Sequence, residues 1–174
     1  VMGASKTVAG SLQFPRTILT MLLPTVVGAW VGKKRGHAWK AMAVAALLVS
    51  ASMLALGLTD AATPVIVYFV AITVTGVAES FRAVSITPSA QATLPPADMG
   101  VGTSLVNFAN SLANTVAATV FGVAYNVCTV ADPTSPALIQ NGVNAVFIIA
   151  AAVTLVGFLL VILVICPKME ATEA

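Results

Sequence analysis

Five long apolar stretches separated by short polar joints constrain this chain more than any other feature. The composition agrees, because 59% of the 174 residues are hydrophobic and only 8% are charged, which is far from the balance of a water-soluble domain. A helix needs about 20 apolar residues, rising about 1.5 Å each, to cross a hydrocarbon core of about 30 Å. Lipid offers backbone amides no partner, so helices are expected. We predict an all-α, polytopic membrane helix bundle with five transmembrane helices at approximately 12–31, 41–58, 64–85, 99–125 and 142–166.

Basic residues indicate how these spans are oriented. They gather at alternate joints: Lys33, Lys34, Arg35 and Lys40, then Arg82, then Lys168. The joints near Asp60 and Asp132 carry no Lys or Arg. By the positive-inside rule, the basic joints are cytoplasmic. The chain is therefore expected to be a multi-pass plasma-membrane protein that begins outside and ends in a cytoplasmic tail at 167–174. An odd number of spans starting outside, with Val1 in first place, predicts a fragment of a longer protein.

Chemistry of the usual enzymatic kinds is not expected. His37 is the only histidine, which disfavours two-histidine metal sites and histidine-based triads. Gly100 and Gly102 lack the preceding strand and the lysine of a nucleotide loop. Cys128 and Cys166 lie at opposite faces of the membrane, too far apart for a disulfide. We predict no enzyme, no cofactor, no metal and no nucleic-acid partner.

Glu79 and Arg82 are the clearest candidates for function, because ionisable groups at membrane depth are costly. They are three residues apart on the third span and so share a helix face. Counted from Pro64, Glu79 lies about 22 Å along the helix axis. Glu79 is either a proton-titrating carboxylate, governed by Arg82 or a substrate cation, or half of an interfacial ion pair that closes the helix end. The ion-pair interpretation is slightly favoured, because Arg82 can extend to the headgroups.

Arg16 is the second ionised side chain within a span. It follows Pro15 about one turn into the first span. It either faces a water-filled cavity, where it would bind an anion or a carboxylate on a helix outside this chain, or extends outward to the membrane surface. The sequence leaves both open.

The fourth span carries a polar stripe. Its members recur every three or four residues and therefore share one helix face: Ser104, Asn107, Ser111 and Asn114, with Asn110 at the margin. Small residues on the same line, Gly100, Ala118 and Gly122, would let another helix approach closely. Helix packing is the favoured interpretation and direct substrate contact the alternative; both turn the stripe away from lipid. Spans 41–58 and 142–166 have no such face and are expected to be lipid-facing supports.

These motifs, taken in order, resemble a known family. The run ITPSAQATLPPADMGVGTSLVNFANSLANTVAATVFG (86–122) is similar to the C-terminal half of a major facilitator superfamily transporter, most of all to the multidrug:proton antiporter branch, with Gly100, Ser104 and Asn107 in matching places. The joint with Lys33, Lys34, Arg35 and Gly36 resembles a cytoplasmic loop signature of that family, although Gly32 stands at its acidic position.

The resemblance implies five helices of a six-helix C-terminal half. Span 64–85 would then line a central cavity, spans 12–31 and 99–125 would contact a missing N-terminal half, and the basic joint would act as a cytoplasmic gating loop. The implied function is secondary active transport, proton-coupled export of a small molecule by alternating access. The alternative is a self-standing five-helix membrane scaffold or subunit that docks a partner through the Asn and Ser stripe.

Overall fold

The computed structural model of this chain describes residues 10–34, 36–92 and 94–171. Over these ranges the regular structure is entirely helical, and five helices are long and apolar enough to cross a membrane, as the sequence predicts. They are α2 (Phe14–Val31), α3 (Gly36–Gly57), α4 (Val65–Ala92), α5 (Met99–Thr129) and α6 (Pro136–Leu160). The chain is therefore compatible with a multi-pass membrane protein.

Several helices extend beyond the predicted spans. The third span was expected to end at residue 85, but α4 continues through Pro88 to Ala92. The fifth was expected to begin at residue 142, but α6 starts at Pro136, where a missing N–H costs nothing because it lies in the first turn. In each case the polar end of the helix lies outside the apolar window from which the span was predicted.

The expected tail also begins as helix. After α6 a single π-helical turn, Val161–Ile165, leads into α7 (Cys166–Ala171). Pro167 lies in the first turn of α7 and cannot donate to the backbone ladder. A wider turn directly before it is a recognised way to absorb such a gap.

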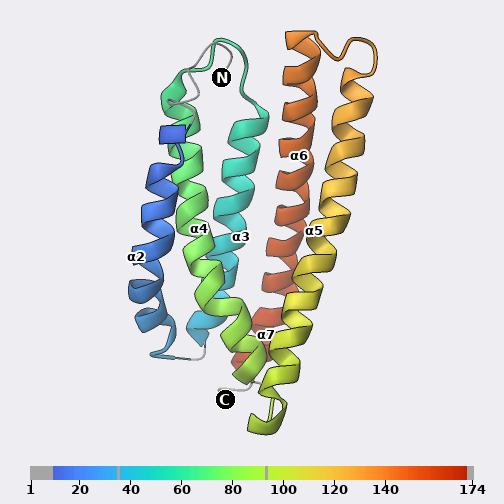
Figure 1. Cartoon of the computed structure of the whole chain (residues 1–174). Helices are drawn as coiled ribbons and strands as arrows, with labels where there is room; N and C mark the ends of the chain where they lie inside the picture. The colour runs from blue at the N-terminus through green and yellow to red at the C-terminus, as the bar shows by residue number, and fades with distance from the viewer. Residues whose placement is uncertain (1–9, 35, 93, 172–174) are drawn as a thin grey trace.

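The five spans form a row in the order α2, α4, α3, α6, α5 (Figure 1). α3 lies at the centre, in contact with α4 and α6, and α2 and α5 form the two edges. This differs from the expectation for the second span, because α3 is the most covered of the five (39% of its window buried), whereas α2, α5 and α6 are the least (6% each). One side of α3 does stay open, with Leu47, Leu54 and Leu58 exposed.

Small and hydroxylic side chains make the central contacts possible. Ser52 of α3 donates to the carbonyl of Ala71 in α4 at 2.6 Å, and Ser50 donates to the carbonyl of Ala151 in α6 at 3.0 Å. Gly57 leaves no room for a Cβ, which would lie 2.8 Å from the side chain of Ile148. The backbones of α3, α4 and α6 therefore approach closely, as is usual where helices associate in lipid.

The two ends of the row differ in charge, and we name them accordingly. The basic end holds the α2–α3 joint with Lys33 and Lys34. The acidic end holds the α3–α4 and α5–α6 joints with Asp60 and Asp132. Each of these carboxylates accepts hydrogen bonds from the backbone and hydroxyl of the residues that follow it, which fixes a tight turn.

Candidate functional site

The contact between α2 and α4 is built on two small residues one turn apart, Gly76 and Ser80. A Cβ at Gly76 would lie 2.8 Å from the Cα of Arg16, so only glycine lets α2 come this close. Ser80 is almost fully buried and donates to the carbonyl of Leu19 at 3.2 Å. This small-xxx-small arrangement brings the first turns of α2 against the middle of α4.

At this contact Arg16 and Glu79 form an ion pair. The Nη2 atom of Arg16 lies 3.0 Å from the Oε2 atom of Glu79, and the two side chains are 38% and 33% exposed. The sequence interpretation paired Glu79 with Arg82, and the structure pairs it with Arg16. Arg82 lies one turn further toward the basic end and is exposed, whereas Gly76 draws Arg16 in from the neighbouring helix.

The pair lies about midway between the two ends of the row. Glu79 is 14 residues from Val65, where α4 begins, or about 21 Å along the axis. Arg16 is 14 residues from Trp30, an aromatic residue of the type that marks a membrane interface, again about 21 Å. The distance counted along α4 from the acidic end and the distance counted along α2 from the basic end thus place the ion pair at the same depth. An ionised pair at such a depth is costly to keep in lipid.

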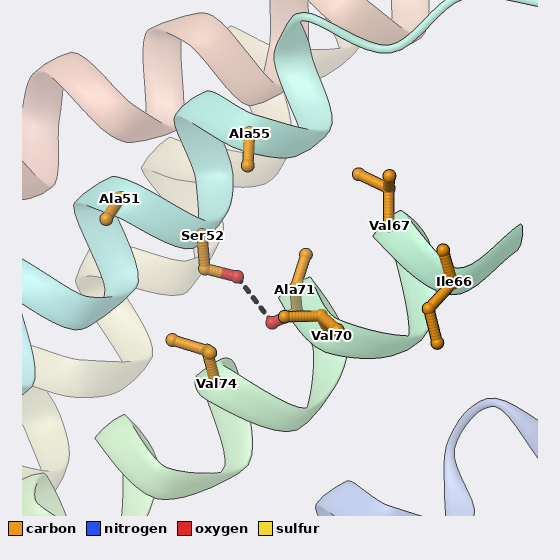
Figure 2. Close-up of a pocket in the computed structure, with 8 residues that line it drawn as sticks. All are labelled: Ala51, Ser52, Ala55, Ile66, Val67, Val70, Ala71 and Val74. Atoms are coloured by element: carbon orange, nitrogen blue, oxygen red, sulfur yellow. Dashed lines mark hydrogen bonds between the residues drawn. The ribbon is translucent and has the colours of Figure 1, made fainter. Parts of the chain in front are cut away.

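α4 has two open sides of opposite character. Figure 2 shows a cavity of about 350 Å³ between α3 and α4 that is almost wholly apolar. It is lined by Ala51, Ser52, Ala55, Ile66, Val67, Val70, Ala71 and Val74. Val70 and Glu79 are nine residues apart, about 180° around the helix at about 100° per residue. The ion pair and the apolar cavity therefore lie on opposite sides of the row.

The predicted stripe of α5 is exposed and faces the same side as Glu79. Residues advance clockwise on a helix that runs away from the viewer; seen from the acidic end, α4 runs away and α5 runs toward the viewer (Figure 1). Glu79 lies about 80° onward from Ala71, which contacts α3. Asn107 lies about 40–80° in the same sense from Ala117, Phe121 and Cys128, which are half-buried on the part of α5 that packs on α6. Between α4 and α5 both the direction of the helix and the side on which its neighbour lies are reversed. The two rotations therefore lead to the same side of the row.

The edge helix α2 adds polar groups to this side. By the same arithmetic, Gln13 and Thr17 lie about 60° and about 100° from the α4-facing direction of Arg16, toward the same side. We call this side the polar face. It comprises Gln13, Arg16, Thr17, Glu79, Ser104, Asn107, Ser111 and Asn114. Asn110 is exposed at its margin, nearer to α6. The structure thus places the candidates of three spans on one face, except Arg82, which lies toward α3 and the basic end.

The amides of the stripe have no partner among the described residues. Ser104 donates to the carbonyl of Gly100 within its own helix, at 2.9 Å. No hydrogen bond joins the side chains of Asn107, Asn110 or Asn114 to another described residue, and all three are exposed. An amide left without a partner in hydrocarbon is unfavourable, so the face is suited to water or to another polar helix.

Two polar residues that the sequence reasoning missed join α3 to α6 at the acidic end. Asn144 donates to the carbonyl of Thr59 at 2.7 Å, and Gln140 donates to the same carbonyl at 3.3 Å and to the Asn144 side chain at 2.7 Å. Both lie in the first turns of α6, and Thr59 lies just beyond the end of α3. The signal was present, because two amide residues four apart share a helix face in an otherwise apolar span.

The predicted gating loop is only partly described. Lys33 and Lys34 are exposed, Gly36 begins α3, and Arg35 lies outside the described residues. The His37 ring stacks on Trp30 at 4.4 Å and its Nδ1 lies 2.7 Å from the Trp30 carbonyl oxygen. These contacts fix the joint between α2 and α3.

The basic end also holds α4 and α5 together. The side chain of Gln91 donates to the hydroxyl of Thr103 at 2.7 Å, and the side chain of Leu94 covers Gly102. α4 and α5 are therefore linked here, while further along the row α3 and α6 separate them.

The described part of the chain has no group of three His, Cys, Asp or Glu side chains that could hold a metal ion. Cys128 and Cys166 are not joined in a disulfide. A scan against models of known protein families finds no match, and searches of curated proteins and of solved structures find no similar chain.

Proposed function

We propose that this chain is part of a secondary active transporter that moves small molecules by alternating access and couples them to protons through Glu79. The observation that carries this proposal is the ion pair between Arg16 and Glu79, which joins the first turn of α2 to the middle of α4 and is partly exposed on a polar face. Carboxylates at such depth are characteristic of substrate and proton pathways.

A polar face of this size cannot be in stable contact with lipid. The opposite side of the row exposes leucines and valines, which suits the bilayer, whereas the polar face exposes amides and a charged pair. A second helical bundle facing it would enclose the polar face around a water-filled space. Motion of the two bundles about that space would expose the pair to either side of the membrane in turn.

The orientation and partners follow from the same proposal. The basic end would be cytoplasmic, in the plasma membrane, and Lys33, Lys34, Arg35 and Gly36 would form a gating loop there. The facing bundle would be the N-terminal half of a major facilitator superfamily transporter, as the sequence resemblance implies. That resemblance also supplies the expected direction, export of a small molecule in exchange for protons.

The test is proton flux through the full encoded protein in proteoliposomes. Pyranine is trapped inside, and ethidium (a cation) or benzoate (an anion) is added outside in separate runs. A proton-coupled transporter changes the lumenal pH, relative to protein-free liposomes, with the compound that it carries. Glu79→Gln should abolish this change, because the coupling carboxylate is gone. Asp98→Asn is the matched control, since Asp98 is an exposed carboxylate in the short helix before α5. Flux in Glu79→Gln equal to that of the parent protein would exclude the role of Glu79.

The second candidate, a scaffold that docks a partner through α5, is favoured by the unpartnered amides of Asn107 and Asn114. It predicts that the double variant Asn107→Leu/Asn114→Leu loses association with its partner while Glu79→Gln keeps it. A transporter predicts loss of flux in both.

A further inference from the structure

The ion pair at mid-depth contains one charge that can be switched off and one that cannot. Glu79 can be neutralised by a proton, whereas the guanidinium of Arg16 stays charged at every accessible pH. While the two are paired the site carries no net charge. Whether a proton or an ion binds favourably at this site therefore depends on the net charge that its binding leaves on Arg16 and Glu79.

Few other ionisable groups surround the pair. Along α4 the nearest is Arg82, one turn toward the basic end, and Tyr68 lies three turns toward the acidic end. The described residues of α2 add only Arg16 itself, and residues 41–57 of α3 add none. α5 contributes Tyr125 and Cys128 near the acidic end, and residues 136–160 of α6 contribute none. No other carboxylate is available in these helices to balance Arg16.

We infer that this pair is a joint binding site for one proton and one small anion, the proton on Glu79 and the anion, a carboxylate or similar group, on Arg16. A proton alone leaves Arg16 uncompensated, next to Arg82 and in a medium of low dielectric. An anion alone must displace Glu79 and leaves that carboxylate uncompensated. The two together restore neutrality, so each favours the binding of the other.

A cation is a less favourable ligand for the same site than a proton together with an anion. To reach Glu79 it must displace Arg16, and the freed guanidinium cannot release its proton. The loaded site would then carry a net positive charge, with Arg82 one turn away adding to it. A monovalent cation is therefore disfavoured by the same reasoning that favours a proton with an anion.

The geometry allows an anion to approach. The side chain of Arg16 is 38% exposed on the polar face, so part of its planar array of donors is accessible while it is paired. Gln13 lies one turn before it on the same face, and its exposed amide offers a neutral donor beside the guanidinium. A guanidinium binds a carboxylate with two parallel hydrogen bonds, which suits this arrangement.

The inference deepens the proposed function and rests on it only for the direction of movement. A load of proton plus anion favours cotransport of the two over the exchange that the family resemblance implies. Binding itself is reciprocal: if protonation raises anion affinity by a given factor, the anion raises proton affinity by the same factor.

The test measures benzoate binding to the full encoded protein in detergent micelles by titration calorimetry at two proton concentrations, about pH 5.5 and about pH 8. We expect at least tenfold tighter binding at the lower pH in the parent protein. Glu79→Gln mimics the protonated carboxylate and should bind benzoate tightly at both pH values. Arg16→Gln should not bind it. Lys40→Gln is the control, since it removes an exposed cation at the basic end, and it should behave as the parent does.

Three results would overturn the inference: benzoate binding weakened by Glu79→Gln, binding in the parent protein independent of pH, or no binding by either the parent or Glu79→Gln. Because Arg16→Gln could disturb the α2–α4 contact, the conclusion depends on Glu79→Gln, which keeps the shape of the side chain. The assay does not involve transport. Benzoate binding of the expected kind without any flux in proteoliposomes would refute the proposed transport and leave the binding site in place.

Discussion

Replacing Gly76 with alanine tests whether the close approach of α2 and α4 creates the charged site. The added Cβ would lie 2.8 Å from the Cα of Arg16 and 3.1 Å from its carbonyl oxygen. Carbon atoms in contact are about 3.5 Å apart or more, so the methyl group is at least about 0.7 Å too close. Both obstructing atoms belong to the backbone, and the helix as a whole must move.

The size of the effect follows from this displacement. A shift of about 0.7 Å would stretch the hydrogen bond from Ser80 to the Leu19 carbonyl, now 3.2 Å, beyond a useful length. Overpacking of this kind costs roughly 1–3 kcal/mol and the hydrogen bond about 0.5–1.5 kcal/mol. The better helix propensity of alanine returns about 1 kcal/mol. We expect Gly76→Ala to lower the free energy of unfolding by roughly 1–3 kcal/mol.

The measurement is thermal or denaturant unfolding of the full encoded protein in detergent, with Gly122→Ala as the matched control. Gly122 is also within a helix, but a Cβ there meets no atom within 4 Å. The control should be unchanged or up to about 1 kcal/mol more stable. If Gly76→Ala were as stable as Gly122→Ala, the close contact would be wrong, and with it the structural reason for pairing Arg16 with Glu79.

Two further predictions concern the acidic end. Asn144→Ala should lower the free energy of unfolding by about 1–2 kcal/mol, because the Thr59 carbonyl loses its 2.7 Å donor; the exposed Asn141→Ala should stay within about 0.5 kcal/mol, and equal effects would refute the assignment. Hydrogen bonds from the hydroxyl and N–H of Thr134 lower the pKa of Asp132 below its ordinary value of 3.8. A lowered pKa means that the charged form stabilises the folded state at neutral pH and that this contribution is lost as pH falls through the folded pKa. Stability measured against pH should therefore fall less on the acid side in Asp132→Asn, and an unaltered acid limb would contradict this.

The five spans were predictable because lipid imposes both length and composition on any helix that crosses it. The residues at which the helices begin and end were less predictable. The apolar pattern of the third span stops near residue 85, where the membrane surface is expected, but backbone hydrogen bonds continue α4 to Ala92. Composition reports where the solvent changes, and helix ends are set by hydrogen bonding.

The sequence identified Arg16 and Glu79 as candidate residues, but it did not identify them as partners of each other. Spacing along one helix suggested Glu79 with Arg82, because local spacing is the only geometry that a single sequence displays directly. The true partner depends on a contact between two helices. A signal for that contact existed: Gly76 and Ser80 form a small-xxx-small pair on the same span, and such pairs mark helix contacts in membranes. Used that way, the motif identifies the face of α4 that packs on a neighbour, although not the neighbour itself.

The position of α3 shows why apolarity alone misleads in this chain. In water, apolar side chains are driven inward, but lipid is as apolar as leucine and provides no such force. Size then decides which surfaces meet. The buried residues of α3 are mostly Ala and Ser, as at Ala41, Ala45 and Ser52, and its exposed residues include Leu47 and Leu54. An Ala-rich span without charge therefore belongs at the centre of a helix row, where backbones can approach, and its leucines mark the side that faces lipid.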